Sequence, residues 1–298
     1  MINIKFNDNI KNKYKSFEEI LKLDNYNDIN YIDCAYNKLS NLPELPNSLV
    51  ELHCNNNKFS ILPELPNSLI HLNCDSNNLS SLPELPNSLE YLSCSYNNLS
   101  SLPELPNSLT LLWCAYNNIS SLPELPNSLV KLYCNYNNLS ILPELPNLLI
   151  YLYCGYNKIS NLPKLPSLLI NLYCSNNILS SLPELPNLLK YFWCYSNNIF
   201  GLPELPNSLK ILYCNENYLT SLPELPNSKI YIRFYDNPIY THIQKYFNGE
   251  TKKYFEYKLK LQRIFANKIG NWFLDCKYNP KYLYCRKRLM KEYDELYN

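Results

Sequence analysis

Apolar and polar positions recur along this chain every twenty residues, without insertion, from residue 29 to residue 239. Each unit has the form Leu-x-x-Leu-x-Cys-x-x-Asn-x-Leu and is followed by the segment Leu-Pro-x-Leu-Pro. A constant period of this length predicts a solenoid, in which each unit packs only against its neighbours. The twenty-residue unit is therefore the element from which the fold must be built.

The first half of each unit predicts a short β-strand. Around Leu92 and Cys94 apolar and polar residues alternate, so a strand there buries one face. Tyr91, Ser93 and Ser95 are expected on the exposed face. Eleven such strands, stacked in parallel, would form a single sheet. The Asn after each strand could tie its turn to the next unit, since a side-chain amide both donates and accepts hydrogen bonds.

The second half of each unit predicts an extended return segment. Of the 22 prolines, twenty lie in ten copies of Leu-Pro-x-Leu-Pro, from Leu42–Pro46 to Leu222–Pro226. Each proline fixes its own φ angle and pushes the preceding residue towards extended geometry. A helix is therefore excluded there, and the convex side of the solenoid is expected to be polyproline-like.

The cysteines follow the same period, and we expect them to be free, buried thiols. Ten of the 12 fill one small apolar position of successive units, and none forms the closely spaced pairs of a zinc site. They are Cys34, Cys54, Cys74, Cys94, Cys114, Cys134, Cys154, Cys174, Cys194 and Cys214. Such thiols belong in a reducing compartment, and we expect neither a metal nor another cofactor.

These residues carry a resemblance to known families. The unit resembles the leucine-rich repeat, with Cys at its third apolar position. Its twenty-residue length and its Leu-Pro-x-Leu-Pro return resemble the repeats of secreted bacterial effector proteins. The Cys position, the Asn- and Tyr-rich composition and the tail 279–282 resemble leucine-rich-repeat proteins of giant DNA viruses of the mimivirus type. The resemblance implies a right-handed horseshoe of the α/β class, mostly β, with a parallel concave sheet and a protein-binding role.

Both ends of the solenoid are expected to carry helical caps, because an open repeat stack must be covered. Residues 1–28 would form the N-terminal cap, with a capping box at Ser16–Glu19 leading into an amphipathic helix. The solenoid would span residues 29–239. Residues 240–298 would form the C-terminal cap, with one helix over 250–274 and a second from 279 to about 296.

Aromatic residues on the exposed strand positions are the candidate binding site. They gather in the later units, and Tyr and Trp are the residues most enriched at binding hot spots. The proposed partner-binding residues are Trp113, Tyr133, Tyr151, Tyr153, Tyr173, Tyr191, Trp193, Tyr195 and Tyr213. Stacked rings also stabilise neighbouring strands, so a purely structural role stays open.

Other functions have weaker support. The formal net charge of +1 and the lack of an apolar run of about 20 residues favour neither nucleic acid nor membrane as a partner. Without a recognisable secretory signal, we expect a cytoplasmic protein, in a host cell or a virion if viral. A virion or assembly component is the alternative to a host-interaction protein.

Catalysis is not expected. Some bacterial proteins join this type of repeat to a catalytic ubiquitin-ligase domain with a nucleophilic cysteine, and Cys276 is the local hint of one here. Asp33, Glu51, His53, His71 and Asp75 could form a metal or acid–base site on the first strands, or else a polar rim. We favour a non-catalytic protein-interaction scaffold.

Overall fold

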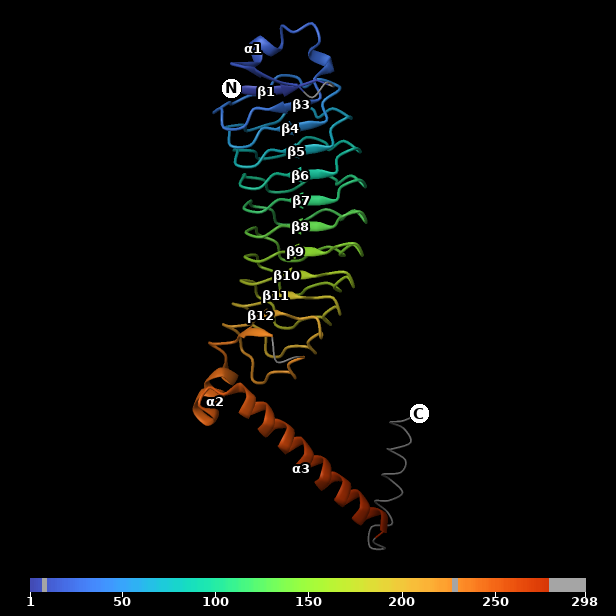
Figure 1. Ribbon diagram of the computed structural model, residues 1–298, viewed down its shortest axis with the longest axis vertical. Helices are drawn as coiled ribbons and strands as arrows, with labels where there is room; N and C mark the ends of the chain where they lie inside the picture. The colour runs from blue at the N-terminus through green and yellow to red at the C-terminus, as the bar shows by residue number, and fades with distance from the viewer. Residues whose placement is uncertain (7–9, 227–229, 279–298) are drawn as a thin grey trace. The chain divides into compact units, whose positions relative to one another are not determined.

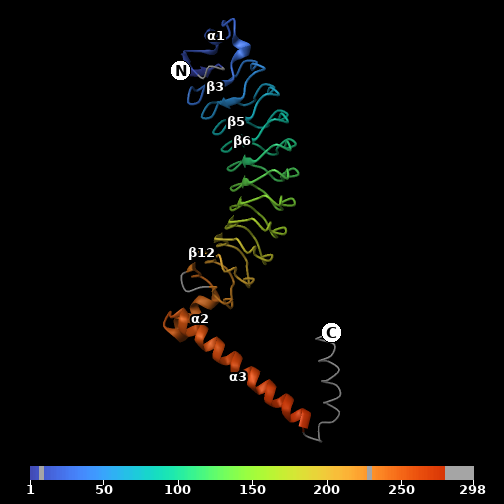
Figure 2. The ribbon, with the colours of Figure 1, turned by 45° about the vertical axis from the view of Figure 1, so that its right-hand side comes forward.

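The computed structural model describes residues 1–6, 10–226 and 230–278, which belong to two compact units, Met1–Ile239 and Tyr240–Asn298. The first unit is a solenoid around one 13-stranded sheet, whose strands lie one above another (Figures 1 and 2). Its repeating strands are β3 (Tyr31–Asp33), β4 (Glu51–His53), β5 (His71–Asn73), β6 (Tyr91–Ser93), β7 (Leu111–Trp113), β8 (Lys131–Tyr133), β9 (Tyr151–Tyr153), β10 (Asn171–Tyr173), β11 (Tyr191–Trp193), β12 (Ile211–Tyr213) and β13 (Tyr231–Arg233).

Each of these strands from β3 to β12 pairs in parallel with the strand twenty residues later. The register puts Tyr133 beside Trp113 and Tyr153, so equivalent positions form columns along the stack. The middle residue of each strand points inwards, as Leu132 does with 0% exposure, and so does the following cysteine, such as Cys134. The core is therefore a set of stacked leucine and cysteine columns.

Two expected surface residues are buried. Ser93 is 0% exposed and Ser95 is 7% exposed, although the alternation puts both on the outer face. The carboxylate of Asp75 accepts a hydrogen bond from Ser93 Oγ at 2.7 Å and another from Ser95 N–H at 2.6 Å. On the next strand the ring of Trp113 reaches that of Tyr91 at 5.9 Å. The short serines are covered by larger side chains of neighbouring repeats, among them Asp75 and Trp113.

A ladder of asparagine side chains closes the turn after each strand. Asn137 Nδ2 donates to the carbonyl of Cys114 in the preceding unit at 2.9 Å and to that of Cys134 in its own unit at 3.1 Å. Its Oδ1 accepts from Ile119 N–H at 3.0 Å. One amide thus satisfies buried backbone groups of two units, as the sequence predicts.

The return segments contain neither helix nor strand in the described residues, in agreement with the constraint that proline imposes. Each ends in a tight turn, in which Leu129 N–H donates to Pro126 O at 3.0 Å. The serine of that turn contributes a further link, because Ser128 Oγ donates to Leu109 O of the preceding unit at 2.7 Å.

The N-terminal cap is mainly a β-hairpin with a short helical part, so the expected helical cap is present only in part. Strands β1 (Ile2–Lys5) and β2 (Lys11–Tyr14) pair antiparallel, and β1 extends the sheet beside β3. Ile2 and Ile4 alternate inwards and continue the core. The helical part is limited to α1 (Phe17–Ile20) and the 3₁₀ turn η1 (Tyr26–Asp28).

The expected capping box of α1 does not form as predicted. Ser16 is the N-cap, but its side chain makes no capping bond. Glu19 instead accepts from Lys15 N–H at 2.8 Å. On β2, at the edge of the sheet, Lys11 and Lys13 carry charge, which discourages pairing with another strand.

The second unit contains α2 (Pro238–Phe247), which begins at the boundary, and α3 (Thr251–Tyr278). Phe247 and Tyr254 meet with ring centroids 5.7 Å apart, which holds the two helices together. The second C-terminal helix expected from residue 279, and the side chain of Cys276, lie outside the described residues. None of the described helices has the length and apolarity required to cross a bilayer.

Removal of one ladder amide is expected to destabilise the solenoid. Asn137→Ala leaves buried carbonyl and amide groups of two units unpaired, which should lower the free energy of unfolding by about 3 kcal/mol. Asn138→Ala is the matched control, because that side chain is exposed, and it should change stability by less than about 0.5 kcal/mol. Urea denaturation of both variants measures this. Equal stabilities would show that the amide ladder is dispensable.

The buried thiols predict alkaline destabilisation. Burial raises the pKa of Cys114 and of Cys154 to about 12, whereas an unfolded thiol ionises near ~8.5. Between these values the folded state holds more protons than the unfolded state, so the free energy of unfolding falls as pH rises. Each thiol contributes up to ~1.4 kcal/mol per pH unit in that window.

Urea unfolding at about pH 7.5 and about pH 9.5 measures this loss through the linear dependence on denaturant. Cys114→Ala removes one of the titrating thiols and should make the pH dependence shallower than in the unaltered chain. Stability that stays constant between the two pH values would contradict the burial of the thiols as protonated groups.

Candidate functional site

The third residue of six consecutive strands, β7 to β12, carries an aromatic ring. We call this column the aromatic row; it consists of Trp113, Tyr133, Tyr153, Tyr173, Trp193 and Tyr213. The parallel register places each ring beside the next. Trp113 is 36% exposed and the others are half-buried, so one side of the row contacts the sheet and the other faces outwards.

Ring contacts run through the whole aromatic row. Trp113 meets Tyr133 edge to face at 5.4 Å, and Tyr133 stacks on Tyr153 at 4.7 Å. Towards the other end Trp193 meets Tyr213 edge to face at 6.3 Å. Both geometries are favourable for aromatic pairs. The rings therefore stabilise the sheet while part of their surface remains accessible.

The flanking tyrosines predicted from the sequence lie beside this row. Tyr151 and Tyr191 open strands β9 and β11, and Tyr195 follows β11; all three are half-buried. Tyr191 stacks on Trp193 at 6.1 Å, and the Lys131 ammonium lies 5.3 Å from the Tyr151 ring centroid. The structure thus brings all nine candidate residues onto one face of the sheet.

A second aromatic column forms a more regular stack at the turn after the strands. Tyr96, Tyr116, Tyr136 and Tyr156, the tyrosine stack, have centroids 4.2, 4.1 and 4.0 Å apart and interplanar angles of 11°, 12° and 9°. Each has a φ of 53° to 55°, a region that residues with a side chain seldom adopt. Stacking offsets part of the conformational cost that this turn imposes.

The regular pattern is interrupted around Tyr173. Its ring lies over Gly155, where an added Cβ would be only 2.4 Å from Tyr173 Cε1. The Tyr173 hydroxyl is 3.1 Å from that of Tyr195. Burial, followed by this hydrogen bond, raises the pKa of Tyr173 far above its usual range.

Further hydroxyl groups converge on the same point. The pKa of Tyr156 is lowered because the Tyr136 hydroxyl, and then that of Tyr195, donate hydrogen bonds towards its oxygen. Nearby, Ser175 Oγ is buried and has no hydrogen-bond partner among the described residues. The sequence analysis missed this cluster; its one signal was glycine at position 155, where other units have a side chain.

The fold and this face can now be compared with known proteins. No protein-family model and no curated protein matches the chain. Among solved structures, YopM from Yersinia enterocolitica WA-314 is 42% identical, with a TM-score of 0.66 over 67% of this chain and 44% of that one. YopM from Yersinia pestis, a leucine-rich effector protein, is 42% identical, with a TM-score of 0.67 over 70% of this chain and 61% of its own.

This chain is a leucine-rich-repeat protein. Its twenty-residue repeats are similar to those of the YopM effectors, and it covers less than two thirds of the length of either YopM chain. The functional domain of InlJ from Listeria monocytogenes, described as including a cysteine ladder, is 25% identical with a TM-score of 0.53 over 70% of this chain and 54% of its own. The column of buried cysteines in this chain is a feature of the same kind.

The acidic and histidine residues of the first repeats do not form a site like that considered from the sequence. His53 Nε2 lies 3.5 Å from Glu51 Oε2, whereas Asp75 is held by Ser93 of β6 and by Ser95 after it. Burial raises the pKa of Asp75, partly offset by the hydrogen bonds from Ser93 and Ser95. Over the described ranges, no three His, Cys, Asp or Glu residues are grouped so that they could hold a metal ion.

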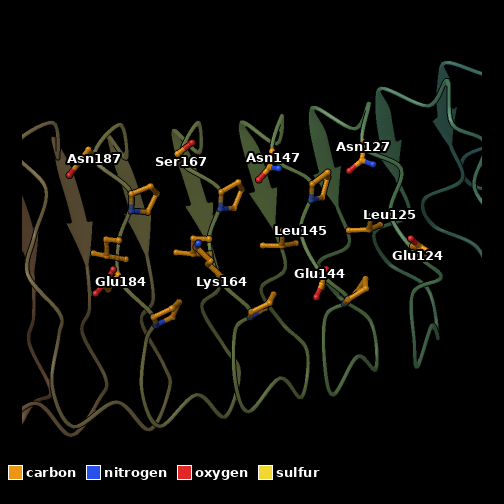
Figure 3. A pocket seen from close by; sticks show the side chains of 18 residues that line it. Glu124, Leu125, Asn127, Glu144, Leu145, Asn147, Lys164, Ser167, Glu184 and Asn187 are labelled. Atoms are coloured by element: carbon orange, nitrogen blue, oxygen red, sulfur yellow. The ribbon is translucent and has the colours of Figure 1, made fainter.

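The return side of the repeats carries a groove that the sequence analysis missed. It is open, has a volume of about 1390 Å³ and runs between Glu124 and Asn187 (Figure 3). Prolines and leucines of the Leu-Pro-x-Leu-Pro segments line it, together with Glu144, Lys164 and Glu184. The variable residue of each segment was the signal, since it is Glu in the other units and Lys only at position 164.

Gly155→Ala should disturb the Tyr173 cluster. The new methyl group would meet both the Tyr173 ring and the Ser175 carbonyl oxygen, 2.9 Å away, so the ring and the adjacent backbone must shift. We expect a loss of about 1–3 kcal/mol in the free energy of unfolding and a change in the near-ultraviolet circular dichroism of the tyrosines.

Gly201→Ala is the matched control, because an added Cβ there meets nothing within 4 Å. That variant should keep the spectrum and be as stable as the original or up to ~1 kcal/mol more stable, since alanine restricts the unfolded chain. Indistinguishable behaviour of the two variants would mean that glycine at position 155 does not position Tyr173.

Proposed function

We propose that this leucine-rich-repeat protein is a non-catalytic scaffold that binds a partner protein through the aromatic row and its flanking tyrosines. One observation carries the proposal: six consecutive strands present half-exposed rings in one continuous column. A contiguous apolar surface on a soluble domain commonly marks an interaction site. Tyr and Trp offer wide contact area with few torsions to restrain on binding.

The charge distribution on this face supports a partner with an uncharged contact surface. Lys131 is the charged residue among the outward-facing first and third residues of strands β7 to β12. The half-buried Tyr173 and Tyr195 hydroxyls add polar groups at one point of the row, where they could recognise a hydrogen-bonding group of the partner. Apolar contact would supply most of the affinity, and the hydroxyls would fix the position of the partner.

The likeness to YopM, an effector protein, supports a role in contact with a host. The buried free thiols suit a reducing environment, so the site of action would be the cytoplasm of a host cell. The Cys position and the Asn- and Tyr-rich composition support an origin among giant-virus proteins, with a virion component as the second possibility.

The proposal is tested by the triple variant Trp113→Ser, Tyr153→Ser and Trp193→Ser. Serine already occupies this column at Ser93, so the fold should tolerate it. Loss of three of the six rings should weaken partner binding by about 100-fold or more. Proteins captured by the unaltered chain from host-cell extract would be identified by mass spectrometry, and their affinities for both forms measured with purified components.

The matched control is Phe200→Ser with Tyr218→Ser, which removes two exposed, mutually stacked rings outside the strands. This control should retain full binding. A photo-crosslinking residue at position 153 should link to the same partner, whereas one at position 218 should not. Undiminished binding by the triple variant, or crosslinking from position 218 alone, would disprove this role for the aromatic row.

A further inference from the structure

Three consecutive repeats depart together from the common pattern at the turn that ends the return segment. Where the other repeats have serine, they have leucine at positions 148, 168 and 188, which we call the leucine ridge. Ser128 and Ser208, on either side, donate to the main-chain carbonyls of Leu109 and Leu189 at 2.7 and 2.6 Å. Leucine cannot form this bond.

The leucines of the ridge gain no burial in exchange. Leu148, Leu168 and Leu188 are 49%, 39% and 47% exposed. At these positions the protein loses a hydrogen bond to the backbone and exposes an apolar side chain to water. Positions that depart in this way from the pattern of the other repeats are often functional. Three of them in adjacent units, ~4.8 Å apart, make a ridge about 10 Å long.

Charges of alternating sign accompany the leucine ridge. Glu144, Lys164 and Glu184 line the return groove of the same three repeats, and their side chains are exposed (Figure 3). In the described part of the chain Lys164 takes part in no ion pair. The same three repeats therefore present acid, base and acid at intervals of one repeat, each charge four residues before a leucine of the ridge. A complementary surface would carry base, acid and base beside an apolar stripe.

Helix α3 has this complementary pattern. Lys252, Glu256 and Lys260 are exposed and four residues apart, so they lie along one face at steps of ~6 Å. The adjacent stripe holds Tyr257 and Ile264, which are 48% and 40% exposed. Their separation along the helix is ~10.5 Å, close to the length of the leucine ridge.

We propose that the leucine ridge binds helix α3 of a second copy of this chain. The apolar stripe of α3 covers the three leucines, and its Lys252, Glu256 and Lys260 oppose Glu144, Lys164 and Glu184. The order of charges on each surface is the same from either end, so the charges can pair in both orientations of the helix. In one of these two orientations the apolar stripe of α3 also faces the leucine ridge. The surface is separate from the aromatic row and leaves it free for a partner.

Self-association of the full-length chain tests the proposal, measured by sedimentation equilibrium over a range of concentrations. The unaltered chain should form dimers or larger species. The triple variant Leu148→Ser, Leu168→Ser and Leu188→Ser should be monomeric yet fully stable, because it restores the serine of the other repeats. Ile61→Ser with Ile141→Ser is the control, since those side chains are 64% and 63% exposed in a different column, and it should associate normally.

A charge exchange tests whether α3 is the occupant. Lys164→Glu restores the residue found in the other repeats, so folding should be unaffected, while association should weaken at least about tenfold because Glu256 then meets like charge. Adding Glu256→Lys should recover association. A monomeric unaltered chain, association that survives the leucine replacements, or a double variant no better than Lys164→Glu would each overturn the proposal. The triple variant of the aromatic row should associate normally, which separates this result from a failure of partner binding.

Discussion

The solenoid depends on the sharing of buried backbone hydrogen bonds between neighbouring repeats through one asparagine amide. Asn137 bonds carbonyls of two successive units and accepts from the preceding one. Buried backbone groups without a partner are costly, so an isolated unit would leave several of them unpaired. The stability of each repeat is thus a property of its contacts with the next, which fixes the twenty-residue period and the parallel register together.

That register also explains how one face can serve two purposes. Because equivalent positions lie side by side, an aromatic residue at one position becomes a row of contacting rings. In the tyrosine stack the rings compensate for an unfavourable backbone angle at the turn. In the aromatic row they contact each other less regularly and keep part of their surface exposed. The same chemical group therefore supports the turn in one column and remains partly accessible in the other.

Much of this architecture could be predicted because it depends on a period that the sequence shows directly. The strands, the buried Cys134 column and the Asn137 ladder all follow from spacing alone. The N-terminal hairpin was missed because Ile2 and Ile4 give only one short alternation, which the local helix signal at Ser16 outweighed. Ser93 and the Tyr173 cluster could not be foreseen either, since their burial depends on the size of neighbouring side chains in other repeats.

The uniform register between repeats has a consequence for how such a protein can change in length. Each interior repeat presents the same backbone edge above and below, so duplication or loss of a whole twenty-residue segment of the gene would create no new type of contact. The aromatic row would lengthen or shorten in steps of ~4.8 Å, one ring at a time. The hairpin of β1 and β2 is the exception, because its antiparallel pairing differs from every interior edge and sets where growth must stop.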